Sequence, residues 1–187
     1  MPSRGTGGFA LLCALAVSGL SARADEVTLC YNFGCYARAP VEFREDQLAP
    51  LQRQLAAAAD AAGERGAISS VIGRMYAIAG EQTPVWRDQG GNYADSGENG
   101  KMDCIDHSTN TSAFLRLLQA RGWLRFHEVL KPLMRRRYFF AEHWAARIRE
   151  RKTQAMYIVD SWFFDNGQPA GVFALEDWRA GKTPNVQ

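Results

Sequence analysis

The chain has 187 residues, of which 47% are hydrophobic and 22% are charged, and this composition is typical of a single globular domain. Its 22 lysine and arginine residues nearly balance its 20 aspartate and glutamate residues, which gives a formal net charge of +2. So small a charge argues against a general electrostatic attraction to nucleic acid, and we expect no nucleic-acid partner.

The first 24 residues have the pattern of a secretory signal peptide. Arg4 supplies a positive charge, residues 9–20 form an apolar run too short to span a bilayer, and small residues precede a cleavage site after Ala24. Cleavage would remove Arg4 and Arg23 and no acidic residue, which lowers the basic count from 22 to 20, equal to the acidic count. We therefore expect a periplasmic or secreted protein with one domain over 25–187 and no stable membrane insertion. An uncleaved anchor is the alternative.

Two cysteines lie close together in the segment that follows. Cys30 and Cys35 enclose Asn32 and Gly34, which favour a tight bend. In an oxidising compartment, cysteines this close usually form a disulfide. The spacing predicts a disulfide across a small turn, and a metal-binding or redox-active pair is the alternative.

The rest of this half alternates between regular elements and polar segments. We expect strands over 27–31 and 35–43 and helices over 44–62 and 67–80, with Gly63 and Gly66 breaking the helical pattern. The stretch over 81–103 is polar and glycine-rich, and loops of this length are uncommon unless they are functional or disordered. We interpret it as one wall of a substrate cleft, with a mobile surface loop as the alternative.

The second half changes from helix to strands. We expect a helix over 104–121, strands over 124–130, 138–148 and 155–162, a turn at Asn166-Gly167 and a short helix over 175–181. The triplet Arg135-Arg136-Arg137 is interpreted as a solvated turn, with an anionic substrate or partner as the alternative. Helices followed by strands predict an α+β fold in which an antiparallel sheet packs on the 104–121 helix.

Cys104 is the free thiol of this arrangement and lies where the 104–121 helix is predicted to begin. A helix N-terminus favours a thiolate, an imidazole can take the thiol proton, and a carboxylate can hold that imidazole. His143 and Asp160 lie in the predicted strands that follow. These residue types, in this order, predict a cysteine nucleophile with a histidine general base and an aspartate that fixes the histidine tautomer.

The spacing of the two strand residues supports this prediction. His143 and Asp160 lie 17 residues apart, and strands of about ten residues joined near 149–153 would place them side by side. We expect both side chains to face the start of the helix that carries Cys104. The backbone N–H of Cys104 is a candidate oxyanion donor, and Gln89 and Asn92 are side-chain candidates for a second donor.

At these residues the chain resembles the transglutaminase-like superfamily, in particular the bacterial transglutaminase-like cysteine proteinases. In that family a Gly-Asp-Cys-x-Asp motif opens the nucleophile helix, a histidine follows on a strand, and an aspartate follows on the next strand. The matching segments here are Met102-Asp103-Cys104-Ile105-Asp106, Glu142-His143-Trp144 and Ile158-Val159-Asp160, with Met102 in place of the glycine. The resemblance covers about residues 65–165 and implies a papain-like core with no metal and no organic cofactor.

Other interpretations of these residues remain open at this point. His107 is a competing base three residues after Cys104, and these two with Asp103 and Asp106 could form a metal cluster, although their spacing suits tetrahedral zinc poorly. The thiol could be inert, and His143 and Asp160 could be structural.

Two functional hypotheses follow. The first is an exported cysteine peptidase or amidase that cleaves peptide or isopeptide bonds of a peptide or protein substrate through a Cys104 thioester, with water or an amine as acceptor. The second is an interaction module that keeps the transglutaminase-like fold outside the cytoplasm without turnover. Met102, Trp144 and Trp162 support the second hypothesis, because they depart from the motif or crowd the site.

Overall fold

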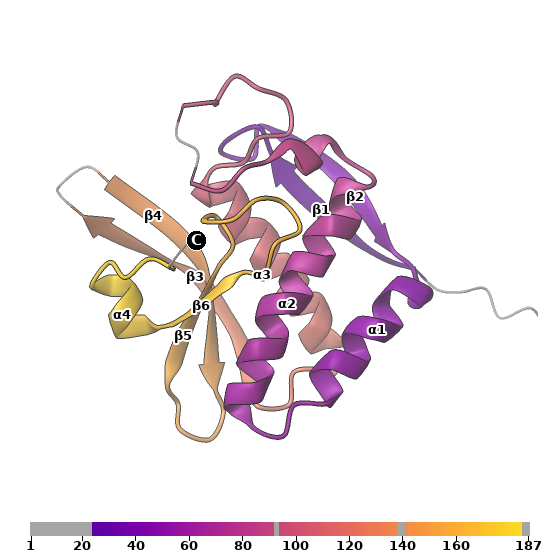
Figure 1. The fold of residues 1–187 in the computed structure, drawn as a ribbon, viewed down its shortest axis with the longest axis vertical. Coiled ribbons are helices and arrows are strands. Elements are labelled where there is room, and N and C mark those ends of the chain that lie inside the picture. The colour runs from indigo at the N-terminus through magenta and orange to yellow at the C-terminus, as the bar shows by residue number, and fades with distance from the viewer. Residues whose placement is uncertain (1–23, 92–93, 138–140, 185–187) are drawn as a thin grey trace, which may run out of the picture.

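The computed structural model describes residues 24–91, 94–137 and 141–184 (Figure 1). Its elements are β1 (Asp25–Tyr31), β2 (Ala37–Phe43), α1 (Glu45–Ala56), α2 (Ala61–Gly80), the 3-10 helix η1 (Pro84–Arg87), α3 (Cys104–Ala120), β3 (His127–Arg137), β4 (Ala141–Glu150), β5 (Met156–Asp160), β6 (Gly171–Ala174) and α4 (Leu175–Arg179). The predicted signal peptide lies outside the described residues except for Ala24, and it stays a prediction. No helix in the described ranges has both the length and the apolar character needed to cross a membrane.

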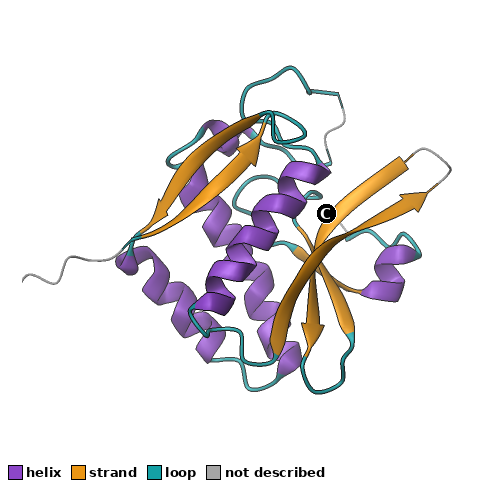
Figure 2. Ribbon diagram, turned by 180° about the vertical axis from the view of Figure 1, so that it is seen from behind, coloured by secondary structure: helices purple, strands orange, loops and turns teal. Residues whose placement is uncertain are grey.

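Two antiparallel sheets flank the helices, so the α+β class expected from the sequence is confirmed. One sheet is the β1-β2 hairpin, and the other has the order β3-β4-β5-β6, in which each strand pairs with the next along the chain. Helix α3 contacts β1 on one side and β4 on the other (Figure 2). Cys104 therefore begins a helix that both sheets hold in place.

The two faces of the four-stranded sheet pack against different helices. Ala146, Ile148 and Val159 join the main core, which includes fully buried α3 residues such as Phe114. A smaller cluster forms on the opposite face from Ala145, Ile158, Leu175 and Trp178, and the last two belong to α4. Figures 1 and 2 show α4 on the side of this sheet away from the long helices. The face that a strand residue occupies therefore decides which helix it meets.

The boundary between the first two helices differs from the prediction. The expected helix over 44–62 is interrupted at 57–60, because α1 ends at Ala56 and α2 begins at Ala61. Asp60 caps α2 through its side chain, which accepts a hydrogen bond from the Gly63 N–H at 2.7 Å. Such a cap contributes about 1 kcal/mol, comparable to the helix penalty of one glycine. Gly63 and Gly66 therefore lie inside α2 and do not end it.

The arginine triplet lies in a strand, so the predicted solvated turn is wrong. The strand expected over 124–130 is instead β3, which extends through the triplet and pairs with β4. The Arg135 guanidinium lies 4.6 Å from the centre of the Trp178 ring and donates to the Trp178 carbonyl. Arg136 pairs with Glu142 across the hairpin. Cross-strand and α4 contacts, which the sequence does not reveal, thus hold the first two arginines.

The predicted disulfide between Cys30 and Cys35 is present. Asn32 and Gly34 have positive φ angles of 65° and 64°, which is the bend expected from these residue types. Cys30 ends up buried against α3. The loop enclosed by the disulfide therefore lies beside the start of the helix that carries Cys104.

Candidate active site

The first turn of α3 presents the thiol of Cys104. Asp103 is the N-cap, and its carboxylate accepts hydrogen bonds from the N–H groups of Ile105 and Asp106 at 3.0 and 2.9 Å. The Cys104 side chain is a free thiol of intermediate exposure. Among the hydrogen bonds of the described residues, none uses the Cys104 N–H. This group points from the positive end of the helix dipole and is available to an anion.

His143 and Asp160 form a direct contact between neighbouring strands. The Nε2 atom of His143 lies 2.7 Å from Oδ2 of Asp160. The sequence predicted that His143 and Asp160 lie side by side on the two strands. The pairing of Ala146 with Val159 shows instead that they are diagonal neighbours. The β4-β5 hairpin is centred one residue later than direct pairing of His143 with Asp160 requires, and this shifts the register by two residues. A diagonal pair is still within reach of a histidine side chain.

The pair shares one face of the sheet, but it is not the face that α3 covers. His143 lies two residues before Ala145, and Asp160 lies two residues after Ile158, so both belong to the α4 face. The expectation that both side chains face the start of the helix that carries Cys104 is wrong as to the face of the sheet, because α4 covers the face that they occupy. Cys104 instead reaches His143 along β4, where its Sγ lies 4.0 Å from the carbonyl oxygen of Glu142. The contact occurs beyond Ala146, where the pairing of β4 with β5 ends.

Asp160 is held by two further donors that sequence reasoning missed. The indole Nε1 of Trp178 donates to Oδ2 at 2.9 Å, and the Trp162 N–H donates to Oδ1 at 3.3 Å. Only 1% of Asp160 is exposed. A buried tryptophan N–H needs an acceptor, so Trp178 in the short closing helix indicates that a hydrogen-bond acceptor lies nearby. No pattern of neighbouring residues identifies Asp160 as that acceptor.

Aromatic rings surround the imidazole. The ring centres of Trp162, Phe163 and Trp178 lie 5.0, 5.6 and 5.9 Å from that of His143. These contacts bury most of the histidine side chain, of which 12% is exposed to solvent. The rings restrict the rotation of the imidazole and exclude water from the Asp160 contact.

The surroundings of His143 favour its charged form. Burial alone lowers the pKa of His143, but hydrogen bonds to Asp160 and Cys104 and the negative charges of both groups outweigh burial and raise it to about 9. The imidazolium is therefore the main form at neutral pH. Its positive charge lies next to the Cys104 sulfur, with which the imidazole shares a hydrogen bond.

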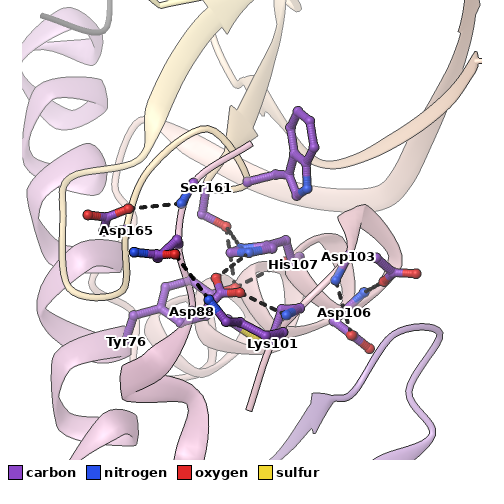
Figure 3. Close-up of polar contacts among 12 residues, drawn as sticks. Tyr76, Asp88, Lys101, Asp103, Asp106, His107, Ser161 and Asp165 are labelled. Atoms are coloured by element: carbon purple, nitrogen blue, oxygen red, sulfur yellow. Dashed lines mark hydrogen bonds and ion pairs between the residues drawn. The ribbon is translucent and has the colours of Figure 1, made fainter. Parts of the chain in front are cut away.

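His107, the competing base, is committed elsewhere. Its Nδ1 lies 2.9 Å from the Ser161 hydroxyl, and its Nε2 lies 2.9 Å from Oδ2 of Asp88 (Figure 3). The side chain is buried, and Tyr76 and Thr111 extend the same network through Ser161. With both ring nitrogens occupied, His107 joins α3 to the segments around Asp88 and Ser161 and is not oriented toward the thiol.

Asp106 ties the disulfide loop to the start of α3. Its Oδ1 accepts the Cys35 N–H at 2.6 Å, while Oδ2 of Asp103 accepts the Gly34 N–H at 3.0 Å. One turn later, Asn110 bonds both backbone groups of Cys30 at 2.7 Å. Burial and the nearby charge of Asp103 raise the pKa of Asp106 to about 6, although the backbone donors oppose this. These bonds fix the helix start against the β1-β2 hairpin.

The long polar segment lies beside the turn that follows Asp160. Gly90 donates to Oδ1 of Asp165 at 2.9 Å, and Gly91 donates to the Trp162 carbonyl at 2.8 Å. Of the two side-chain oxyanion candidates, Gln89 is exposed and accepts from Lys101 Nζ, and no hydrogen bond of the described residues joins it to Cys104. Asn92 lies outside the described residues.

The described residues contain one close group of potential metal ligands, made of Cys30, Cys35 and Asp106. Both sulfur atoms belong to the disulfide, and a metal requires thiolates. Asp106 also accepts backbone N–H bonds in this place. The chemistry of this donor set therefore suits a structural clamp and does not suit a metal ion.

Comparisons of the chain with models of protein families, with curated proteins and with solved structures found no match. The likeness to the transglutaminase-like cysteine proteinases therefore depends on the three short motifs. The geometry around Cys104, His143 and Asp160 carries the functional argument.

Proposed function

We propose that the protein is a thiol-dependent acyl-transfer enzyme, a cysteine peptidase or amidase with a papain-like core of the transglutaminase type. Cys104 is the nucleophile, His143 the general acid and base, and Asp160 the residue that orients the imidazole. The observation that carries the proposal is His143, which contacts the thiol on one side and the buried Asp160 on the other. The nucleophile helix also packs on an antiparallel sheet, as such a core requires.

The contacts assign a role to each nitrogen of the imidazole. Nε2 is bound to Asp160, so Nδ1 is the nitrogen available to the thiol and the substrate. The Cys104 thiolate attacks the substrate carbonyl, and the Cys104 N–H stabilises the resulting oxyanion. Nδ1–H protonates the leaving amine as the tetrahedral intermediate collapses to a thioester. Nδ1 then takes a proton from water, whose oxygen attacks the thioester and releases the acid and the thiolate, with His143 protonated again.

Two features support a location outside the cytoplasm. The disulfide is of a kind that persists in oxidising compartments, and the first 24 residues have the signal-peptide pattern. We therefore propose a periplasmic or secreted enzyme that acts on peptide or isopeptide bonds of a peptide or protein substrate.

An interaction module without turnover is the second candidate. The aromatic rings packed around His143 favour it, because they limit the room for a reacting group. The two candidates differ in the reactivity of Cys104, since only an enzyme needs an accessible, activated thiolate.

The deciding measurement is the rate at which iodoacetamide alkylates Cys104 between pH 5 and 10. An imidazolium with a pKa of about 9 stays charged below that pH, so its stabilisation of the thiolate operates throughout the neutral range. We expect alkylation to stay fast well below the pKa of a free thiol, about 8.5. His143→Ala should slow the reaction at pH 6 by at least about tenfold.

Mass spectrometry should locate the label and verify that Cys30 and Cys35 stay bonded. Glu142→Gln, at the exposed residue that precedes His143, is the matched control and should react at the wild-type rate. An ordinary thiol profile that is indifferent to His143→Ala would contradict the enzymatic proposal and favour the interaction module.

A further inference from the structure

A groove of about 430 Å³ lies along the outer side of the first turns of α3. Its lining residues come from α3, β3 and β4, and they are Ile105, Ser108, Thr109, Lys131, Pro132 and Trp144. We call it the Ile105–Trp144 groove. Most of its surface is apolar, and it lies outside the buried contacts that hold His143 and Asp160.

Two residues that line the groove neighbour candidate catalytic residues in the chain. Ile105 follows the nucleophile Cys104 in the chain, and Trp144 follows the base His143. Ile105 is 42% exposed, although it is a large hydrophobic residue in the first turn of a helix whose other face is buried. A single exposed isoleucine needs no explanation, but one that lines a groove at the nucleophile suits contact with a substrate.

The two faces of β4 decide which part of a substrate the groove can reach. Trp144 points to the face opposite His143, because side chains alternate along a strand. The leaving amine must lie at the imidazole, which protonates it, so the leaving side of the substrate lies on the His143 side. We therefore place the acyl side away from His143, toward the groove that Ile105 and Trp144 line.

We infer that the Ile105–Trp144 groove binds the side chain of the residue that supplies the reacting carbonyl, and that this side chain is large and apolar. The inference depends on the proposed function of Cys104. Lys131 adds a selection against basic residues, because it is exposed on the lining of the groove and would repel a lysine or arginine side chain. The substrate class is thus a peptide or amide with an aromatic or large aliphatic acyl residue.

The probes for this inference are the N-acetylated chloromethyl ketones of phenylalanine, glycine and lysine. In each reaction the Cys104 sulfur forms a bond to the methylene carbon, and chloride leaves. Mass spectrometry gives the second-order rate for Cys104, and iodoacetamide, which has no side chain for the groove, normalises for thiol reactivity. We expect the phenylalanyl ketone to react at least about tenfold faster than the glycyl and lysyl ketones after normalisation.

Two variants test whether the groove causes the preference. Thr109→Phe places a ring in the groove and should reduce the phenylalanyl-to-glycyl ratio, with each rate normalised to the iodoacetamide rate of the same variant, to near one. Ile105→Ala removes an exposed apolar side chain and should lower the same ratio severalfold, and it serves as the test if Thr109→Phe does not fold.

The outcomes separate the two proposals. Equal normalised rates for the ketones, together with fast iodoacetamide alkylation at pH 6, would overturn the groove inference and leave the enzyme proposal standing. A phenylalanyl preference that survives both variants would also overturn it, because the side chain would then bind elsewhere. Slow iodoacetamide alkylation that is indifferent to His143 would remove the proposed function, and the groove inference with it.

Discussion

Asp160 accepts more hydrogen bonds than any other group of the candidate catalytic set. The imidazole of His143 and the indole of Trp178 both approach Oδ2, and the Trp162 N–H approaches Oδ1. A carboxylate can accept all three bonds, whereas an amide must turn a donor toward one of these groups. Asp160 therefore orients the imidazole and also ties α4 to the sheet.

Asp160→Asn should consequently lower both the reactivity of the Cys104 thiol and the stability of the fold. We expect iodoacetamide alkylation of Cys104 at pH 6 to slow by at least about tenfold, because the imidazole loses the partner that favours its charged form. The free energy of unfolding should fall by about 1–3 kcal/mol, because one of the three buried groups that approach Asp160 loses its hydrogen-bond acceptor. Urea unfolding and timed alkylation measure the two effects.

Glu142→Gln is again the comparison, since it changes a carboxylate to an amide beside His143 at an exposed position. If Asp160→Asn behaved like Glu142→Gln in both measurements, Asp160 would have no role in orienting the base.

At the scale of elements, the turn after β5 positions the aromatic wall of the site. Trp162 and Phe163 lie in this turn and pack against His143. Gly90, in the long polar segment, supports the turn from outside. A Cβ atom on Gly90 would lie 2.3 Å from the Phe163 carbonyl oxygen, which is closer than atoms approach without a shift. Only glycine lets the two segments meet at this distance.

Gly90→Ala should therefore displace the turn without altering any candidate catalytic residue. We expect a destabilisation of about 1–3 kcal/mol, as for an overpacked contact, and a severalfold slower alkylation of Cys104 at pH 6. Gly97→Ala is the matched control, because a Cβ atom there meets nothing within 4 Å. Equal melting temperatures and alkylation rates for the two variants would show that the turn does not depend on this approach.

The sequence predicted the elements whose signals are local. The polar start of α3 and the apolar run of β5 placed Cys104 and Asp160 on the correct elements. The diagonal register of His143 and the face it occupies depend on the hairpin turn and on α4, and neither has a strong local pattern. Strand β6 has only four residues, and the Trp178–Asp160 bond spans 18 residues, so neither could be predicted from nearby residues.

At the scale of the whole molecule, α3 packs against both sheets and so fixes their relative position. The four-stranded sheet supplies His143 and Asp160, whereas the β1-β2 hairpin holds the start of the helix. The carboxylates of Asp103 and Asp106 accept the N–H groups of Gly34 and Cys35. The Asn110 side chain accepts the N–H group of Cys30. The disulfide keeps those N–H groups in one arrangement, so the distance from Cys104 to His143 depends on a loop remote from both strands.

This arrangement predicts that the disulfide affects the thiol as well as stability. The double variant Cys30→Ala, Cys35→Ala opens a loop of about six residues, which should lower the free energy of unfolding by about 2 kcal/mol. Because the acceptors on Asp103 and Asp106 then lose fixed donors, the start of α3 should become less well placed, and alkylation of Cys104 at pH 6 should slow severalfold under conditions where the variant is still folded. A variant that loses stability yet alkylates at the wild-type rate would show that α3 is positioned by the four-stranded sheet alone, and that the hairpin contributes only to the stability of the fold.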